Sequence, residues 1–169
     1  MQLTKVEQEK QAYLLLGSNL GDRHGNLARA RDLILSHGGQ LLDQSAIYLS
    51  EAWGLKHQAD YYNQVVVIKT KLSAPDLLRT ILNIEMEIGR TRDLKWGARI
   101  IDIDIIFYAD EEIQTANLTV PHPRIAERNF TLVPLMELSP AMMHPTLGVT
   151  IEELYLRAAD SLDVIMIEN

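Results

Sequence analysis

Runs of hydrophobic and polar residues change their spacing several times along the chain, and each change predicts an element. Tyr13–Leu16 is a short apolar run that stops at Gly17-Ser-Asn-Leu-Gly21, which is typical of a strand followed by a turn. Between residues 27 and 35 apolar residues recur at helical spacing, and Gly38-Gly39 ends the helix that this spacing predicts.

A second strand is predicted at Leu41–Leu49, and the polar segment Glu51–Tyr61 after it reads as a loop. A third strand is predicted at Gln64–Leu72, where the β-branched run Val65–Ile68 favours a well-buried position in a sheet.

Ser73 then offers an N-cap to a long helix, whose apolar stripe runs from Leu77 to Ile88 and which Gly89 ends. The charged stretch Arg90–Gly97 is a predicted loop, and Ile100–Phe107 is a predicted strand rich in isoleucine.

The predicted order is therefore β, α, β, β, α, β, with additions that include a last helix at Ile151–Arg157. Two strands follow each other without an intervening helix, so the sheet should be mostly antiparallel. This order predicts an α+β fold with a ferredoxin-like βαββαβ core and helices packed on its sheet. We expect residues 1–10 to be a polar tail and residues 11–169 to form a single domain.

Composition excludes several classes of function. The 169 residues carry a formal charge of −7, which argues against a nucleic-acid-binding protein, because such a protein needs a basic surface. There is no cysteine, so thiolate catalysis and zinc–thiolate sites are excluded. No stretch reaches the roughly 20 apolar residues that span a bilayer, and no signal peptide is recognisable. The expected location is the cytoplasm, with no membrane partner.

Two acidic residues interrupt the predicted strand Ile100–Phe107. Side chains alternate faces along a strand, so Asp102 and Asp104 should point the same way, about 6.6 Å apart along it. Two carboxylates on one face repel each other, and magnesium is commonly held by one or two carboxylates together with substrate phosphates. The alternative is an edge strand with its acids in water. The surrounding isoleucines suggest a buried strand instead.

Basic residues crowd into the ten positions before that strand: Arg90, Arg92, Lys95 and Arg99. Arginine binds phosphate oxygens bidentately and keeps its charge at any working pH. Alone, the loop could be a solvated surface. Beside two aspartates it favours a metal–phosphate site.

A third cluster is Pro121-His122-Pro123-Arg124, followed by Arg128-Asn129-Phe130. Its cations could donate to further phosphate oxygens, although a rigid turn with exposed cations would look the same. A flat heterocycle could stack on aromatic residues while an amide reads its edge; the candidates are Tyr61, Asn63, Trp53, Trp96 and Phe130.

These segments resemble the hydroxymethyl-dihydropterin pyrophosphokinases of folate biosynthesis from about Tyr13 to Ile151. The motifs stand in order: Gly17-Ser-Asn-Leu-Gly21, Tyr61-Tyr-Asn63, Gly89-Arg90, Trp96-Gly-Ala-Arg99-Ile-Ile-Asp102-Ile-Asp104, and Pro121-His122-Pro-Arg124 with Arg128-Asn-Phe130. The resemblance implies transfer of pyrophosphate from ATP to the hydroxymethyl group of a reduced pterin, giving AMP.

It also implies roles for individual residues. Asp102 and Asp104 would bind two magnesium ions that arrive with ATP, and Arg90 and Arg99 would stabilise the migrating phosphoryl charge. The implied ATP-binding residues are Arg90, Arg99, His122, Arg128 and Glu85. The implied pterin-binding residues are Tyr61, Asn63, Phe130, Trp53 and Ser50. Arg92 and Trp96 would belong to a lid formed by Arg90–Gly97.

Two other classes of function remain open. A different two-metal phosphoryl or nucleotidyl transferase could use the same acidic pair. A non-catalytic ligand-binding domain could use the same fold. We expect a monomer or a weak oligomer that binds ATP and a reduced pterin.

Overall fold

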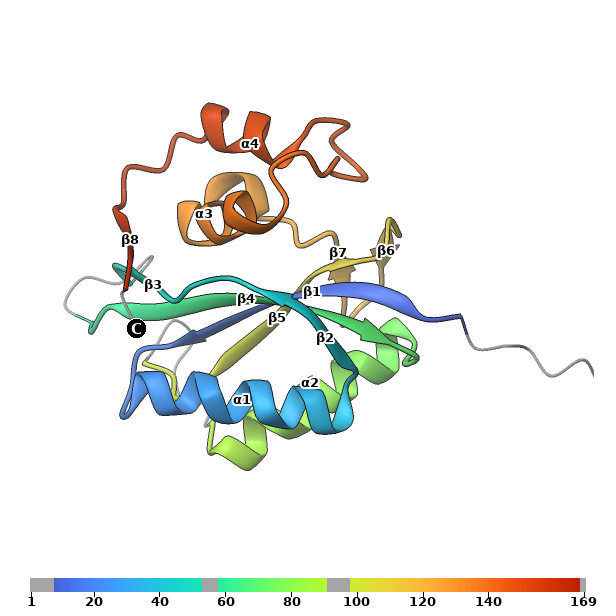
Figure 1. The fold of residues 1–169 in the computed structure, drawn as a ribbon, viewed down its shortest axis with the longest axis vertical. Coiled ribbons are helices and arrows are strands. Elements are labelled where there is room, and N and C mark those ends of the chain that lie inside the picture. Colours follow the sequence, from blue (N-terminus) through green and yellow to red (C-terminus); the bar gives the residue numbers. More distant parts are fainter. Residues whose placement is uncertain (1–7, 53–57, 91–97, 168–169) are drawn as a thin grey trace, which may run out of the picture.

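A computed structural model of the chain describes residues 8–52, 58–90 and 98–167. It shows a twisted sheet with helices on both faces: α1 and α2 lie on one face, and α3 and α4 on the other (Figure 1). The elements in chain order are β1 (Lys10–Ser18), α1 (Arg23–His37), β2 (Gln40–Gln44), β3 (Tyr48–Ser50), β4 (Tyr61–Thr70), α2 (Ala74–Ile88), β5 (Asp102–Tyr108), β6 (Ile113–Gln114), β7 (Thr119–Val120), the 3₁₀ turn η1 (Ile125–Glu127), α3 (Asn129–Leu138), α4 (Ile151–Arg157) and β8 (Val164–Met166).

The main sheet has the strand order β5-β1-β4-β3-β8, and β2 also pairs with β4. Every pairing in this sheet is antiparallel. The predicted ferredoxin-like α+β core is confirmed.

The predicted strand Leu41–Leu49 is wrong in one respect, because it is two short strands. Between them the backbone N–H of Ala46 donates to the Glu137 carboxylate of α3 at 3.0–3.1 Å, so that residue leaves the strand ladder.

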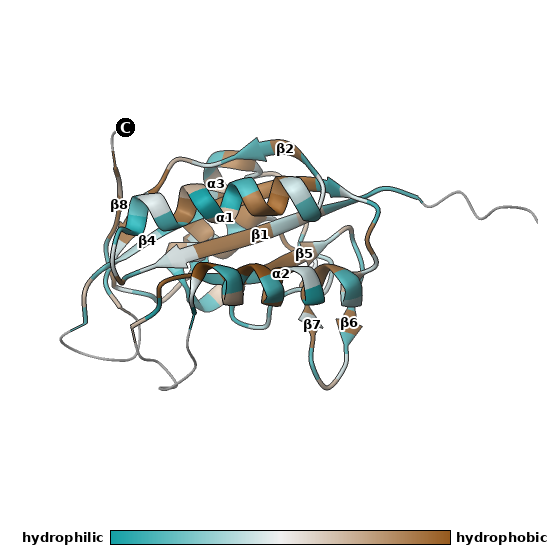
Figure 2. Cartoon of the chain, turned by 90° about the horizontal axis from the view of Figure 1, so that it is seen from below, coloured by the Kyte–Doolittle hydropathy of each residue, from teal (hydrophilic) through white to brown (hydrophobic). Residues whose placement is uncertain are grey.

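The helices α1 and α2 bury their apolar stripes on the first face of the sheet. Leu14 and Leu16 of β1 pack there with Ile103 and Ile105 of β5. In Figure 2 the middle of β1 and β5 is coloured hydrophobic where the two helices cross the sheet. This face is a continuous apolar core, and burial on it drives the two helices onto the sheet.

Local signals fix the ends of α2 as the sequence predicts. The Ser73 hydroxyl accepts a hydrogen bond from the Asp76 N–H at 3.2 Å, and Gly89 ends the helix with φ +109°. Only glycine adopts this conformation without steric cost. In α1, Leu27, Ala30 and Ile34 are buried as expected. Leu35 is 39% exposed, because it lies about 100° around the helix from Ile34.

The second face carries a smaller core under η1, α3 and α4. Tyr13, Leu15 and Phe107 pack there against Leu132 and Leu135 of α3. The β1–β5 register shifts between Tyr13 and Leu14, as in a β-bulge. This second core covers only part of the face, and the remainder carries polar side chains.

Several elements beyond the predicted core appear only in the structure: the β6–β7 hairpin, α3 and the C-terminal strand β8. The predicted helix at Ile151–Arg157 is confirmed, with a capping box between Thr150 and Glu153. Lys10, the last residue of the predicted tail, begins β1, and residues 1–7 lie outside the described part of the chain. The helices that the structure describes are too short or too polar to cross a lipid bilayer.

Candidate active site

The two aspartates of β5 lie on the second face of the sheet. In the register with β1, Asp102 lies opposite Gly17 and Asp104 opposite Leu15. Leu15 packs into the second core, and cross-strand partners share a face, whereas Ile103 packs into the first core. The predicted shared face is therefore confirmed. Although β5 is the last strand of the sheet, the Asp102 side chain is only 25% exposed and both aspartates line a pocket, so the acids are not on a freely solvated edge.

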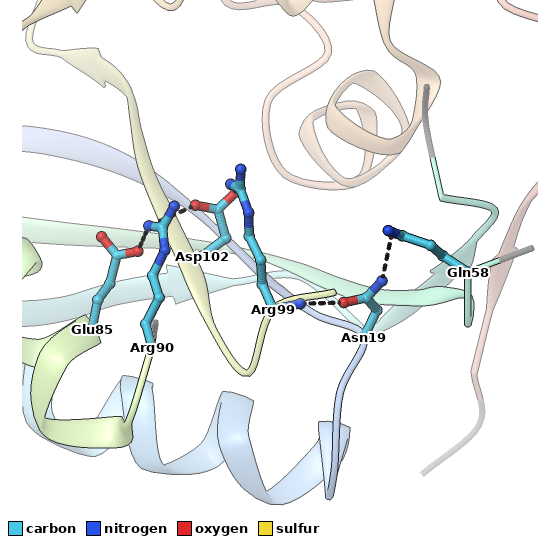
Figure 3. Close-up of polar contacts among 6 residues, drawn as sticks. All are labelled: Asn19, Gln58, Glu85, Arg90, Arg99 and Asp102. Carbon is cyan, nitrogen blue, oxygen red and sulfur yellow. Dashed lines mark hydrogen bonds and ion pairs between the residues drawn. The ribbon is translucent and has the colours of Figure 1, made fainter. Parts of the chain in front are cut away.

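Asp102 lies between two arginines (Figure 3). One carboxylate oxygen is 3.1 Å from Nη1 of Arg90, and the other is 3.0 Å from Nη1 of Arg99. The side chains of all three residues are at most 25% exposed. The basic loop and the acidic strand that the sequence places next to each other thus form direct ion pairs.

Arg90 owes its place to the end of α2. After Gly89 the backbone N–H of Arg90 donates to the carbonyl oxygen of Glu85 at 3.0 Å, and the Arg90 guanidinium pairs with the Glu85 carboxylate. Glu85 is only 2% exposed and does not line the pocket described below. Glu85 therefore contacts Arg90, and its role in ATP binding stays a prediction.

Asp104 is the more buried of the two aspartates. Burial and the nearby negative charge of Asp102 raise its pKa to about 7, and the positive charges of Arg128, Arg90 and Arg99 oppose that rise. Within the described residues no third carboxylate, histidine or cysteine joins the pair as a metal ligand. A hard cation such as magnesium fits this pair, because it accepts one or two carboxylates and completes its shell with phosphate oxygens and water.

His122 and Arg128 form the wall opposite the aspartates. The N–H of His122 donates to the Ile106 carbonyl oxygen at 2.9 Å, which ties this segment to β5. The Arg124 N–H donates to Nδ1 of His122 at 3.2 Å, so the proton of the neutral ring is on Nε2. Burial, followed by the charge of Arg128, lowers the pKa of His122 to about 4. His122 is therefore a neutral donor at neutral pH, which is compatible with the predicted role as a phosphate donor.

The other end of the site is built on β4 and β3. Asn63 is 3% exposed, and its Nδ2 donates to the Ser50 hydroxyl at 2.6 Å. Gly17 lies opposite Asn63 in the sheet, and a Cβ on Gly17 would come within 3.2 Å of the Asn63 Oδ1 and 3.4 Å of the Tyr61 ring. Glycine at this position therefore keeps space free between the two side chains.

One pocket of about 220 Å³ joins the two ends. Its lining consists of Leu15, Gly17, Ser50, Glu51, Gln58, Tyr61, Asn63, Arg99, Asp102, Asp104, His122, Arg128 and Phe130. Most of the residues that the sequence predicts for the site thus meet in one cavity, with the carboxylates of β5 on one side of β1 and Tyr61 and Asn63 of β4 on the other. Trp53, Arg92 and Trp96 lie outside the described residues.

Asn19 is a residue of the site region that the sequence reasoning missed. It is 2% exposed, and its Oδ1 accepts from the Arg99 N–H at 2.7 Å (Figure 3). Its Nδ2 donates to the Ala59 carbonyl oxygen at 3.2 Å. One side chain therefore holds the backbone at both ends of the pocket. Its only signal in the sequence is an asparagine inside the turn 17–21, where turn chemistry alone explains it.

Comparison with known proteins agrees with this geometry. The sequence model of the 7,8-dihydro-6-hydroxymethylpterin-pyrophosphokinase (HPPK) family matches residues 13–140. The chain is 43% identical over 133 residues to a 2-amino-4-hydroxy-6-hydroxymethyldihydropteridine pyrophosphokinase of Aquifex aeolicus, which covers 79% of this chain and 82% of the relative. It is 44% identical over 128 residues to the protein of the same name in Bacillus subtilis, over 75% of this chain and 77% of the relative.

Solved structures support the fold. Wild-type Plasmodium falciparum HPPK-DHPS with pteroate matches with a TM-score of 0.73 at 18% sequence identity, over 88% of this chain. The match covers 42% of that longer protein, so this chain spans less than half of it. At this identity the likeness concerns the fold alone. The sequence match over residues 13–140 and the relatives above 40% identity carry the assignment. The chain therefore belongs to the 7,8-dihydro-6-hydroxymethylpterin-pyrophosphokinase family.

Proposed function

We infer that this chain transfers pyrophosphate from ATP to the hydroxymethyl group of 6-hydroxymethyl-7,8-dihydropterin, as a step in folate biosynthesis. The hydroxymethyl oxygen forms a bond to the β-phosphorus, the bond between that phosphorus and the oxygen bridging to the α-phosphorus breaks, and AMP leaves. The hydroxyl proton is lost to solvent or to a phosphate oxygen. The observation that carries this proposal is the single pocket that holds both sets of groups, with the carboxylates of β5 on one side of β1 and Tyr61 and Asn63 of β4 on the other.

The pterin belongs at the end formed by Tyr61, Asn63 and Phe130. A flat heterocycle gains from stacking on aromatic faces, and Tyr61 and Phe130 both line the pocket. The Asn63 Nδ2 is engaged by Ser50, which fixes the amide and leaves its Oδ1 toward Gly17 to accept a hydrogen bond from the pterin edge. Ser50 thus acts on the pterin mainly through Asn63.

The triphosphate belongs at the charged end. Arg99 and Arg128 line the pocket there, and His122 lines it as a neutral donor through Nε2. A neutral histidine binds a phosphate oxygen without adding charge, whereas arginine compensates charge as it develops in the transition state. Arg90 and Arg99 contact Asp102 in the free chain, so nucleotide phosphates compete with Asp102 for both guanidinium groups.

Asp102 and Asp104 are the residues that would hold magnesium. Bound between their carboxylates and the phosphates, magnesium would neutralise charge that otherwise repels the nucleotide. The buried position of Asp104 and its raised pKa fit such a role, because a carboxylate that is costly to ionise alone gains from a cation beside it. Two magnesium ions remain our proposal for the number bound with ATP.

The direct test is analysis of the products after incubation with ATP, magnesium and the reduced pterin. We expect AMP and pterin diphosphate in equal amounts. ADP as product would indicate a simple kinase, and free pyrophosphate with a nucleotidylated pterin would indicate a nucleotidyl transferase; either result contradicts the proposal. A non-catalytic ligand-binding domain would give no product, and its ligand response would survive Asp102→Ala.

Further parts of the proposal lie outside the pocket. We propose a lid that contains Arg92 and Trp96 and closes over bound ATP, which protection of segment 90–97 from proteolysis by an ATP analogue would test.

A single domain over residues 11–169 predicts one cooperative unfolding transition. A monomer or weak oligomer predicts a mass near 19.1 kDa in dilute solution. Cell fractionation would test the expected cytoplasmic location.

A further inference from the structure

The last described segment of the chain, residues 158–167, returns to the site after α4. We call it the C-terminal segment. It begins beside α3 and ends as β8, the strand that pairs with β3 (Figure 1). It lies after residue 140, where the match to the family model ends.

Asp160 in this segment contacts the start of α3 through two groups, its carboxylate and its backbone carbonyl oxygen. Its Oδ2 accepts from the Asn129 backbone N–H at 2.9 Å, and its backbone carbonyl oxygen accepts from the Asn129 Nδ2 at 3.1 Å. Its Oδ1 accepts from the Leu162 N–H at 3.0 Å, which fixes the carboxylate in its own turn. The hydrogen bond within its own turn therefore fixes the orientation of the Asp160 carboxylate toward the helix.

The start of α3 needs a partner of this kind. The first N–H groups of a helix lack acceptors within the helix, and usually a serine, threonine, aspartate or asparagine at the N-cap supplies one. Here the N-cap is Arg128, whose side chain makes no capping hydrogen bond. Asp160 supplies the acceptor instead, from more than 30 residues away, and its negative charge suits the positive end of the helix dipole.

The residues on either side of this contact belong to the site. Arg128 and Phe130 flank Asn129, both line the pocket, and the Arg128 guanidinium carbon lies 5.4 Å from the centre of the Phe130 ring. The direction in which α3 begins therefore sets where these two side chains project.

The other end of the C-terminal segment contacts the pterin end of the pocket. In β8, Val164 pairs with Ser50 of β3, and the Ile167 N–H donates to the Ile47 carbonyl oxygen at 2.9 Å. Ser50 in turn holds the Asn63 amide. The same segment thus supports both Phe130 and the Ser50–Asn63 pair.

We propose that Asp160 is a positioning residue for pterin binding, which acts through the start of α3 on Arg128 and Phe130, with β8 supporting Ser50 from the other side. This proposal rests on the proposed function, because it takes the pterin to be the ligand of that end of the pocket. Asp160 touches no substrate in this account.

The test compares variants at saturating ATP while the pterin concentration is varied. Asp160→Ala should raise the KM for the pterin and lower kcat/KM about tenfold or more, as expected when a remote change misplaces binding groups. Asp160→Asn keeps one acceptor oxygen for the Asn129 N–H but loses the contact with the Leu162 N–H, so its KM should fall between those of the wild type and Asp160→Ala. Asp163→Ala is the matched control, because Asp163 is an exposed aspartate of the same segment; it should behave as the wild type.

Each assay is run well below the Tm of the variant, with the active fraction counted by binding stoichiometry. A residue that only stabilises the helix would lower the Tm and the active fraction while the KM for the pterin stays unchanged, and that result would overturn the proposal. Equal effects of Asp160→Ala and Asp163→Ala would overturn it as well. If Asp160→Ala does not fold, Asn129→Ala weakens the same contact from the other side. It should raise the KM about threefold, and an unchanged KM would again contradict the proposal.

Titration of pterin fluorescence with a non-hydrolysable ATP analogue present gives the same comparison without turnover. A wild-type chain that binds the pterin but forms no pterin diphosphate would refute the proposed function, while the ratio of Kd values between variants would still decide the role of Asp160. A wild-type chain that does not bind the pterin would refute both.

Discussion

The two faces of the sheet are built from the same strands, but one carries a closed apolar core and the other carries the polar pocket. Against α1 and α2 every central position of β1 and β5 is apolar, and two long helices close this face. Against η1, α3 and α4 the apolar cover stops partway, and Asp102 and Asp104 lie beyond it, beside Arg99, His122 and Arg128.

The difference shows how one strand can serve stability and chemistry together. In β5 the side chains at 103 and 105 enter the first core while those at 102 and 104 face the pocket, because strand residues alternate. Ile103 and Ile105 anchor the β5 backbone in the first core, next to both aspartates. Substitutions on the two faces should therefore separate effects on folding from effects on rate.

The largest expected effect belongs to the aspartates. Asp102→Asn or Asp104→Asn should lower kcat by about 1000-fold or more, since a metal–phosphate interaction contributes several kcal/mol to the transition state. Each variant should keep a Tm close to that of the wild type. Steady-state kinetics over a range of magnesium concentrations, with thermal unfolding as the control, makes the comparison. Near-normal rates at low magnesium in either variant would show that the metal assignment is wrong.

Arg99→Ala should come next, with a loss of about 100-fold in turnover and little change in the affinity for the pterin. The Arg99 side chain compensates charge on the phosphates and does not contact the pterin in the proposed arrangement. Arg79→Ala offers a matched control, because the Arg79 side chain is 72% exposed, pairs with Asp76 on α2 and does not line the pocket. Equal losses in turnover and pterin affinity would point to a binding role for Arg99 instead.

On the other face, Ile103→Ala should reduce the free energy of unfolding by about 2–4 kcal/mol, because it opens a cavity in a closely packed core. Ile103 is only 4% exposed. The kcat of the folded variant should stay within about threefold of the wild type. Urea unfolding measures the free energy of unfolding, and kinetics at low temperature measure kcat. A large fall in kcat with an unchanged free energy of unfolding would contradict the distinction between the two faces.

The smallest expected effect concerns His122 and pH. Its pKa in the folded chain is lowered to about 4, while the unfolded chain has the ordinary value near 6.5. Between these two pH values the unfolded state binds more protons, so the folded chain loses stability as pH falls through that range. We expect up to about 2 kcal/mol after allowance for solvent screening. Urea unfolding at pH 7 and pH 4.5 should show a smaller difference for His122→Gln than for the wild type, and equal differences would contradict the lowered pKa.

Most of the βαββαβ core could be predicted from the sequence, because its signals are local. Ser73 and Gly89 fix the ends of α2 by hydrogen bonding and backbone conformation, and the β-branched run Val65–Ile68 marks the central strand β4. The break between β2 and β3 could not be predicted, since it depends on the Glu137 carboxylate of a distant helix. The helix α3 was missed because it contains Pro134, which normally argues against a helix, whereas tertiary burial of Leu132 and Leu135 supports it here.

The candidate site divides in the same way. Strand alternation is enough to place Asp102 and Asp104 on one face. The short separation in sequence between these aspartates and Arg90 and Arg99 is enough to predict that the two groups lie near each other. The pterin end came from the family resemblance, since Tyr61, Asn63 and Phe130 meet only through the sheet register and the start of α3. Contacts such as that of Asn19 with Arg99 join residues 80 positions apart, and no local pattern announces them.

The most direct test of the account is a crystal structure of the chain with magnesium and a non-hydrolysable ATP analogue. We expect magnesium bound to carboxylate oxygens of both Asp102 and Asp104 and to phosphate oxygens of the analogue, with Arg99 turned from Asp102 toward the phosphates. Nucleotide bound away from β5, or magnesium that contacts neither aspartate, would contradict the claim that this acidic face is the metal–phosphate end of the pocket.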